Sequence, residues 1–233
     1  MHWFYDAAIT PQSVNLAAEE LRHLGSLRIR NGEEIVVTNG VGAAHVFTLQ
    51  DAKQGSIVFR ESLVASRRKP SIHLVQALAK GDRDEMAVQA SVELGVESIT
   101  PWQAQRSIAN WQGKEEKGRS RWEQIAISAM KQSQQSTLAP VLPLVQTSEL
   151  NPRGLGLVLS PTADNGLGQL LDGQAEITLV VGPEGGISSE EIGQLVGQGF
   201  VPCKLGPSVL RTSTAGPAAI AGIQALSGAW EAQ

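Results

Sequence analysis

Three loops rich in glycine, proline and serine carry the residues whose types and spacing are suited to holding a ligand. GPEGG, residues 182–186, ends the apolar run EITLVV and stands directly before a helix signal. SPTADNG, residues 160–166, and LGPSVLRTSTAG, residues 205–216, follow apolar runs in the same way. Glycine lets a ligand approach the backbone closely, and a following helix presents free N–H groups. One such loop would be read as a tight turn, but the three together favour a site.

The residues exclude several familiar kinds of site. GPEGG contains no lysine of a P-loop, no G-x-G-x-x-G dinucleotide fingerprint and no G-x-S-x-G nucleophile elbow. The histidines show no ligand spacing and are interpreted as structural or exposed; they are His2, His23, His45 and His73. Because Cys203 is the only cysteine, an intrachain disulfide and a cysteine-based zinc site are excluded.

The elements that must position these loops follow from the periodicity of residues 71–233. SIHLVQAL, RDEMAVQASVEL and VESITP predict a strand, a helix and a strand, which together form the βαβ unit of a parallel sheet. Further strands are expected at 155–161, 176–183 and 200–205, and helices at 119–133 and 214–230. Ser188 and Glu191 predict a capping box after GPEGG. We therefore expect an α/β fold with helices on both faces of a mostly parallel sheet, and the loops at its carboxyl edge, where such sheets bind ligands.

The N-terminal part follows a different pattern. Residues 14–28 predict a helix, and residues 31–64 show β-rich runs separated by Asn-Gly and Gln-Gly pairs, which is typical of hairpins. The expected fold of this part is a small β-barrel or β-sandwich. SRRKP, residues 66–70, is interpreted as a linker. A chain of 233 residues is long enough for two such domains.

Charge and composition limit the kinds of partner that the protein can have. The formal net charge of −4 argues against indiscriminate coating of nucleic acid. Arg22, Arg28 and Arg30 lie close together in the sequence and predict either a local basic patch or an ordinary solvated face. No apolar stretch approaches the roughly 18 residues of a membrane helix, and the first residues do not look like a signal peptide. We expect a soluble intracellular protein that does not bind a membrane.

Four motifs, in order along nearly the whole chain, give a specific resemblance. VVGPEGGISSEEI and LGPSVLRTSTAGPAAI resemble the paired C-terminal motifs of the bacterial 16S ribosomal RNA uracil-N3 methyltransferase family. ALAKGDRDEMAVQASVELGVESITPWQAQRS is similar to its central motif, and LRHLGSLRIRNGEEI to its N-terminal motif. The family belongs to the knotted SPOUT class of enzymes that use S-adenosylmethionine (SAM).

The resemblance implies a fold, a cofactor and partners. Residues 1–68 would form a PUA-like β-barrel that binds RNA, and residues 71–233 a methyltransferase domain with a trefoil knot. The implied activity is SAM-dependent methylation of N3 of one uridine in 16S ribosomal RNA of the small subunit. A cytoplasmic homodimer is also implied, with SAM held in the knot loops near the partner chain and no metal required.

The resemblance also assigns residues to roles. The cofactor would be bound, largely through backbone groups, by Leu159, Ser160, Gly182, Pro183, Glu184, Gly185, Gly186, Leu205, Gly206, Leu210 and Thr212. RNA phosphates would be bound by Arg22, Arg28, Arg30, Lys80, Arg83 and Arg106. The family usually has an arginine where this chain has Ser208 and a glutamate where it has Ser213. We expect these two departures to change contacts to the substrate more than contacts to the cofactor.

Arg211 is the candidate catalytic residue. Uracil N3 becomes a nucleophile only after losing its proton, and a cationic group near the carbonyls would stabilise the resulting anion. A phosphate contact or an interface ion pair is the alternative role for Arg211, and Glu184 would either orient a group in its loop or act structurally. Two other functions stay open: methylation of another RNA base or a ribose 2′-hydroxyl on the same scaffold, and RNA binding without catalysis.

Overall fold

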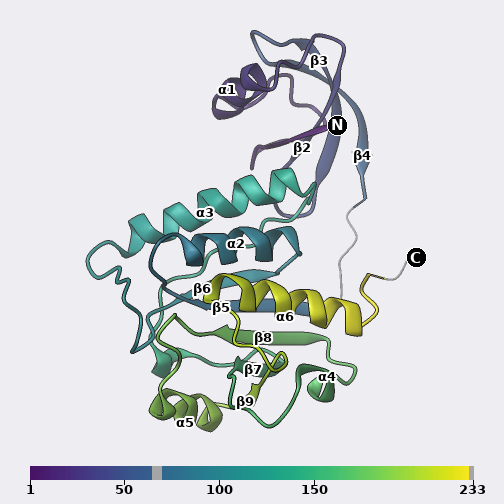
Figure 1. Ribbon diagram of the computed structural model, residues 1–233. Helices are drawn as coiled ribbons and strands as arrows, with labels where there is room; N and C mark the ends of the chain where they lie inside the picture. Colours follow the sequence, from purple (N-terminus) through teal and green to yellow (C-terminus); the bar gives the residue numbers. More distant parts are fainter. Residues whose placement is uncertain (65–69, 231–233) are drawn as a thin grey trace. The chain divides into compact units, whose positions relative to one another are not determined.

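The computed structural model describes residues 1–64 and 70–230, and the chain divides into two compact units (Figure 1). The first comprises Met1–Arg67 and Met130–Leu138, and the second comprises Arg68–Ala129 and Ala139–Gln233. The linker expected at 66–70 lies outside the described residues except for Pro70. Within the described ranges, no helix is long and apolar enough to cross a membrane.

The first unit is built on a four-stranded sheet in the order β1-β2-β3-β4. Its strands are β1 (His2–Tyr5), β2 (Glu34–Thr38), β3 (Ala44–Asp51) and β4 (Ser56–Leu63). β1 runs parallel to β2, whereas the β2–β3 and β3–β4 pairs are antiparallel. The antiparallel pairs are the expected hairpins, but the sheet is mixed and does not close on itself, so a closed barrel is not what these strands form.

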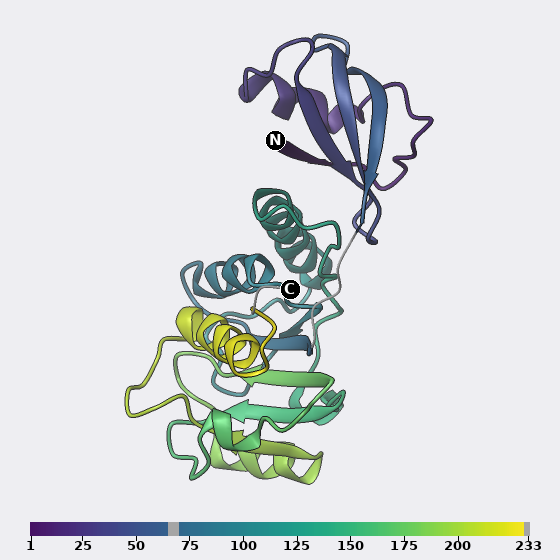
Figure 2. The ribbon, with the colours of Figure 1, turned by 90° about the vertical axis from the view of Figure 1, so that its right-hand side faces the viewer.

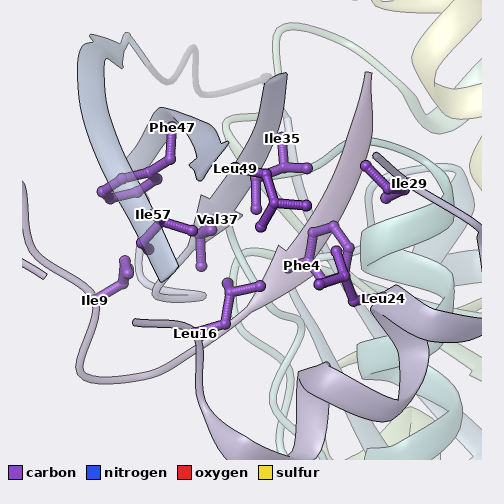
Figure 3. Packing of buried hydrophobic residues seen from close by; sticks show 10 residues of the cluster. All are labelled: Phe4, Ile9, Leu16, Leu24, Ile29, Ile35, Val37, Phe47, Leu49 and Ile57. Atoms are coloured by element: carbon purple, nitrogen blue, oxygen red, sulfur yellow. The ribbon is translucent and has the colours of Figure 1, made fainter. Parts of the chain in front are cut away.

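Alternation along these strands places the core of the first unit on one face of the sheet. Ile35 and Val37 of β2 and Phe47 of β3 are buried in a cluster with Leu24 of α1 (Ala18–Ser26), as Figure 3 shows. The intervening Val36 belongs to a separate, smaller cluster on the other side. The period of two residues therefore fixes which side chains meet the helix.

A segment from later in the chain completes the first unit. Residues 130–138 comprise the end of α3 (Glu115–Gln132) and the stretch that follows it. The Ser136 carbonyl accepts a hydrogen bond from the Thr38 hydroxyl at 2.8 Å, and Lys131 forms a 2.8 Å ion pair with the buried Glu20. No local sequence pattern predicted this return of the chain, because the contacts join residues about a hundred positions apart.

The second unit is an α/β fold whose five-stranded sheet has the order β6-β5-β8-β7-β9, with every pair parallel (Figure 2). The strands are β5 (Ser71–Ala77), β6 (Ser98–Trp102), β7 (Leu155–Leu159), β8 (Glu176–Val181) and β9 (Phe200–Cys203). The helices are α2 (Arg83–Glu93), the part of α3 up to Ala129, α4 (Leu167–Leu170), α5 (Ser189–Gly197) and α6 (Thr212–Leu226), with a 3₁₀ turn η1 (Thr147–Glu149). The predicted α/β class and parallel sheet are confirmed.

Helices cover both faces of this sheet because successive residues of each strand point to opposite sides. Val75 of β5 is buried in a cluster with Leu195 of α5. Its neighbour Leu74 faces α6, where a Cβ built on Gly216 would lie 3.4 Å from Leu74 Cδ1 and equally close to Val181. α6 thus lies close against the sheet, and its first residues reach the carboxyl edge of the strands.

Candidate functional site

A cavity of about 430 Å³ lies at the carboxyl edge of β7, β8 and β9, bounded by the loops that follow these strands. The three strands are parallel neighbours, so their carboxyl ends meet at the same edge. The first turn of α6 contributes Thr212 and Ala215 to the lining. The three glycine-, proline- and serine-rich loops of the sequence therefore come together around one cavity that is open to solvent.

The cavity collects nearly all the residues expected to hold the cofactor. Those that line it are Leu159, Ser160, Gly182, Pro183, Glu184, Gly186, Leu205, Gly206, Leu210 and Thr212. Gly185 is not among the lining residues. A Cβ built on Gly185 would lie 3.0 Å from the Arg106 Cβ and 3.2 Å from the Arg106 carbonyl oxygen. The loop after β6 thus packs closely against Gly185 and would have to shift slightly to admit a larger side chain.

Two glycines of the lining present bare backbone. Gly186 has φ +71° and Gly206 has φ +130°, and a Cβ built on either would meet nothing within 4 Å. A side chain at these positions would strain the backbone. Gly182 serves a different purpose, since a Cβ there would lie 2.6 Å from Ile187 Cγ1. Backbone access for a ligand is therefore concentrated at Gly186 and Gly206.

Glu184 joins two loops at the rim of the cavity. Its Oε1 accepts hydrogen bonds from the Lys80 backbone N–H at 3.0 Å and from Arg83 Nη1 at 3.3 Å. Lys80 follows β5, so the carboxylate ties the loop after β5 to GPEGG. Asp84 holds the same loop from inside, because its Oδ2 accepts from the Ala79 N–H at 3.0 Å. Burial raises the pKa of the Asp84 carboxyl.

Glu191 fixes the helix that follows GPEGG. Its buried carboxylate forms the predicted capping box, accepting from the N–H and hydroxyl of Ser188, both at 3.2 Å. The other oxygen accepts from the Gln105 N–H at 2.8 Å and the Thr147 hydroxyl at 3.0 Å. The start of α5 is therefore anchored to the loop after β6 and to η1. The capping box was readable from the sequence, whereas the contacts to Gln105 and Thr147 were not.

Arg211 lies at the mouth of the cavity, immediately before α6. It is exposed, and its side chain has no hydrogen bond or ion pair to any residue that the structure describes. Val209 and Leu210 line the same stretch with 76% and 37% of their surface exposed. A free guanidinium beside exposed apolar side chains is suited to a ligand that has both a planar apolar part and a carbonyl or phosphate acceptor.

Cys203 lines the cavity but is not suited to nucleophilic chemistry. It is fully buried, and burial raises the pKa of its thiol from 9.0 to about 11. A thiol with so high a pKa contains very little thiolate near neutrality. Covalent catalysis by this residue is therefore not part of the chemistry that the cavity supports.

The residues expected to contact RNA occupy both units. Arg22, Arg28 and Arg30 belong to the first unit, and Arg28 adopts a positive φ of 55°. In the second unit Lys80 is exposed and Arg83 lines the cavity. Arg106 donates from Nη1 to the Gly185 carbonyl at 3.2 Å, which places this guanidinium beside GPEGG. Arg83 thus belongs to the cavity itself, a position that its sequence motif did not reveal.

A cluster of hydrogen-bonded side chains lies at the amino edge of the sheet, opposite the cavity. His73 Nδ1 is 2.7 Å from the Ser98 hydroxyl, and its Nε2 is 2.9 Å from Glu176 Oε1. Ser98 is buried, so these residues serve to link β5 to β6 and β8. Within the described residues, no group of three His, Cys, Asp or Glu is placed to hold a metal ion.

Comparisons with known proteins agree with this architecture. The RNA methyltransferase domain family matches residues 67–224. Ribosomal RNA small subunit methyltransferase E of Mycobacterium bovis is 37% identical over 218 residues, which cover 88% of this chain and 83% of the relative. The crystal structure of ribosomal RNA small subunit methyltransferase E from Neisseria gonorrhoeae bound to S-adenosyl methionine superimposes with a TM-score of 0.88 at 33% identity, covering 97% of this chain and 98% of the other.

A second solved structure gives the same result. A putative methyltransferase from Legionella pneumophila, in complex with the bound cofactor SAM, has a TM-score of 0.86 at 32% identity and covers 96% of both chains. These matches extend over both units of the chain, including the motifs at the cavity. The chain therefore belongs to the RNA methyltransferase family, among the proteins called ribosomal RNA small subunit methyltransferase E.

Proposed function

We propose that the protein transfers a methyl group from SAM to N3 of one uridine in 16S ribosomal RNA of the small subunit. The observation that carries this proposal is the cavity enclosed by the loops after β7, β8 and β9. Relatives that share the whole chain at 33% and 32% identity were crystallised with SAM. The name of the M. bovis relative supplies the substrate class, ribosomal RNA of the small subunit.

The cavity has the properties that SAM requires. Its volume of about 430 Å³ falls within the roughly 300–1,000 Å³ typical of small-molecule sites. Leu159, Ile187 and Leu205 supply apolar surface for a purine, and the bare backbone at Gly186 and Gly206 allows close approach. We assign the adenosine to the loops at 182–186 and 205–212. When bound, SAM supplies an electrophilic methyl group on a sulfonium.

Arg211 has the catalytic role in this proposal. A guanidinium has only donors and can form paired hydrogen bonds, so Arg211 stabilises a uracil anion through a carbonyl oxygen rather than acting as a base. Its exposed position at the cavity mouth and its lack of an intramolecular partner among the described residues support this assignment. A contact to an RNA phosphate is the alternative role, and it predicts a loss of RNA affinity instead of turnover.

Each unit has a part in binding the RNA. We infer that residues 1–68 form a PUA-like RNA-binding domain, in which Arg22, Arg28 and Arg30 contact phosphates. Residues 71–233 form the knotted methyltransferase domain, where Lys80, Arg83 and Arg106 continue the phosphate contacts at the rim of the cavity. Phosphate contacts of this kind position the substrate and weaken with salt. A cytoplasmic homodimer that needs no metal completes the proposal.

Calorimetry with SAM tests the cofactor assignment, because a protein that binds RNA without catalysis needs no cofactor. The target is then tested with purified small subunits from a strain that lacks the gene. Methyl transfer to the small subunit and not to transfer RNA supports the proposal. A methylated ribose or a base other than uracil would instead assign the cavity to another methyltransferase reaction.

A further inference from the structure

A buried pair of polar side chains lies directly beneath the cavity. Gln76 of β5 is completely buried, and its Nε2 donates a hydrogen bond to the hydroxyl oxygen of Thr212 at 2.9 Å. Thr212 is the first residue of α6, is 5% exposed, and lines the cavity. Gln76 itself is not part of the lining. The glutamine therefore reaches the site only through the threonine.

The orientation of the Gln76 amide follows from its second contact. Nε2 also lies 3.1 Å from the Ala77 carbonyl oxygen, which can only accept a hydrogen bond. The atom facing it must be the nitrogen, so one amide hydrogen is donated to Ala77 and the other to Thr212. An amide nitrogen does not accept hydrogen bonds in return. The Thr212 oxygen is thus an acceptor in this pair, and its own proton is left to be donated elsewhere.

No acceptor for the Thr212 proton is found among the residues that the structure describes. The other end of the Gln76 amide has no partner there either, since Oε1 is buried without a hydrogen bond. A buried carbonyl without a partner lowers stability. Methionine would fill a similar volume without that cost. The presence of glutamine is therefore explained by what its NH₂ group does to Thr212.

We propose that Gln76 is a positioning residue, which holds the Thr212 hydroxyl turned so that it donates its proton into the cavity to an acceptor on bound SAM. This inference rests on the proposed function. SAM carries suitable acceptors in its purine nitrogens, ribose oxygens and carboxylate. The close packing of Gly216 against β5 and β8 keeps the first turn of α6 near Gln76, so the pair is held by the fold as well as by the hydrogen bond.

A double-mutant cycle read by calorimetry tests the proposal. Gln76→Met and Thr212→Val each remove one partner, and each is expected to weaken SAM binding about fivefold, as the loss of one oriented hydrogen bond does. The two losses should not add, so the double variant should bind like Thr212→Val alone. Thr212→Ser keeps the hydroxyl and should restore most of the affinity.

The matched control is Gln224→Met. Like Gln76, Gln224 is buried and has an Oε1 without a hydrogen bond, and it lies on α6 together with Thr212. Its Nε2, however, donates to the Leu94 carbonyl, and Gln224 does not line the cavity. This variant should leave SAM affinity unchanged. Thermal unfolding without SAM measures how far each glutamine replacement affects folding alone.

Two results would overturn the proposal while leaving the proposed function intact. One is a Gln76→Met variant that binds SAM as tightly as the wild type. The other is an equal loss from Gln76→Met in the Thr212 and Thr212→Val backgrounds, since Gln76 would then not act through the threonine. A wild-type protein that binds no SAM would instead remove the proposed function.

If Gln76→Met does not fold, the wild-type protein still provides a test. The side-chain amide signals of Gln76 in a ¹⁵N-labelled sample should shift when SAM is added, because donation by the Thr212 hydroxyl strengthens its oxygen as an acceptor. The Thr212→Val variant should lose this response while retaining weaker SAM binding. Signals of Gln76 that do not move on SAM binding would overturn the proposal.

Discussion

Glu191→Gln, which replaces a single oxygen by an NH₂ group, should destabilise the second unit. The carboxylate accepts from a backbone N–H on each oxygen: Gln105 on one side and Ser188 on the other. A glutamine amide must direct its NH₂ at one of these N–H groups in either orientation. The substitution therefore leaves a donor facing a donor, which is the buried Ser188 N–H in one orientation and the partly buried Gln105 N–H in the other.

The magnitude follows from the hydrogen bonds that the substitution removes. The hydrogen bond from one backbone N–H disappears and leaves that N–H without a partner, and the hydroxyl beside it loses the carboxylate oxygen to which it donates. Each such effect is worth about 1–3 kcal/mol, so we expect a loss of about 3 kcal/mol in the free energy of unfolding. At about 2–4 °C per kcal/mol for a chain of this size, the melting temperature should fall by about 6–12 °C. GPEGG ends at the capping box, so SAM affinity should fall as well.

Glu190→Gln is the matched control, because it removes the same charge from an exposed neighbour in the same turn. Surface changes of this kind alter stability by about 0.5 kcal/mol at most, or roughly 2 °C. Thermal unfolding followed by circular dichroism, together with calorimetry for SAM, measures both effects. A Glu191→Gln protein that melts within about 2 °C of the Glu190→Gln protein would refute the reasoning.

Three further predictions address the site and the RNA. Arg211→Ala should lower the turnover rate by roughly a hundredfold with little change in SAM affinity. Arg211→Lys should retain only part of the wild-type turnover rate, because an ammonium lacks the planar fork of a guanidinium. Normal turnover of Arg211→Ala in steady-state kinetics would remove Arg211 from the mechanism. The Cys203 thiol, with its pKa raised by burial from 9.0 to about 11, should carry about a hundredfold less thiolate at pH 8 in the folded protein than after unfolding. Alkylation by iodoacetamide should therefore be slow until denaturant is added, and rapid labelling of the folded protein would contradict the burial. Replacing Arg28 and Arg30 together by alanine should weaken RNA binding and flatten its salt dependence while sparing SAM binding; unchanged binding across a salt titration would mean that these arginines form only a solvated face.

The fold of the second unit was largely readable from the sequence. Its strands are short, largely apolar runs, and β7 and β8 are followed directly by Ser160 and Gly182. All five strands are parallel, so the loops at their carboxyl ends must meet at one edge. The capping box from Ser188 to Glu191 fixed the start of α5 from two residues alone. Local propensity and periodicity determine features of this kind, which is why they can be predicted without knowledge of the packing.

Features that depend on distant contacts were not readable. The segment 130–138 joins the first unit through Ser136 and Lys131, and nothing in its composition indicates the partners Thr38 and Glu20. The barrel implied for the N-terminal part appears as an open mixed sheet, because β1 pairs in parallel with β2 and the strand order then ends at β1 and β4.

The same limit applied within the site. Gly185 was expected to meet the cofactor, and a glycine in a loop can serve a ligand, a neighbouring chain segment or both; the close approach of Arg106 to Gly185 could not be read from the sequence. The hydrogen bond between Gln76 and Thr212 spans 136 positions and crosses from a strand to a helix. A buried glutamine in an apolar strand was the only local signal that this position is unusual.

The central claim is tested most directly by analysing the methylated nucleoside itself. Small ribosomal subunits from a strain that lacks the gene would be incubated with the purified protein and SAM that carries a labelled methyl group. Mass spectrometry of the digested 16S ribosomal RNA should then find 3-methyluridine at one position, with the label and only when SAM is present. Label on a ribose, on another base, or on no nucleoside at all would contradict the account.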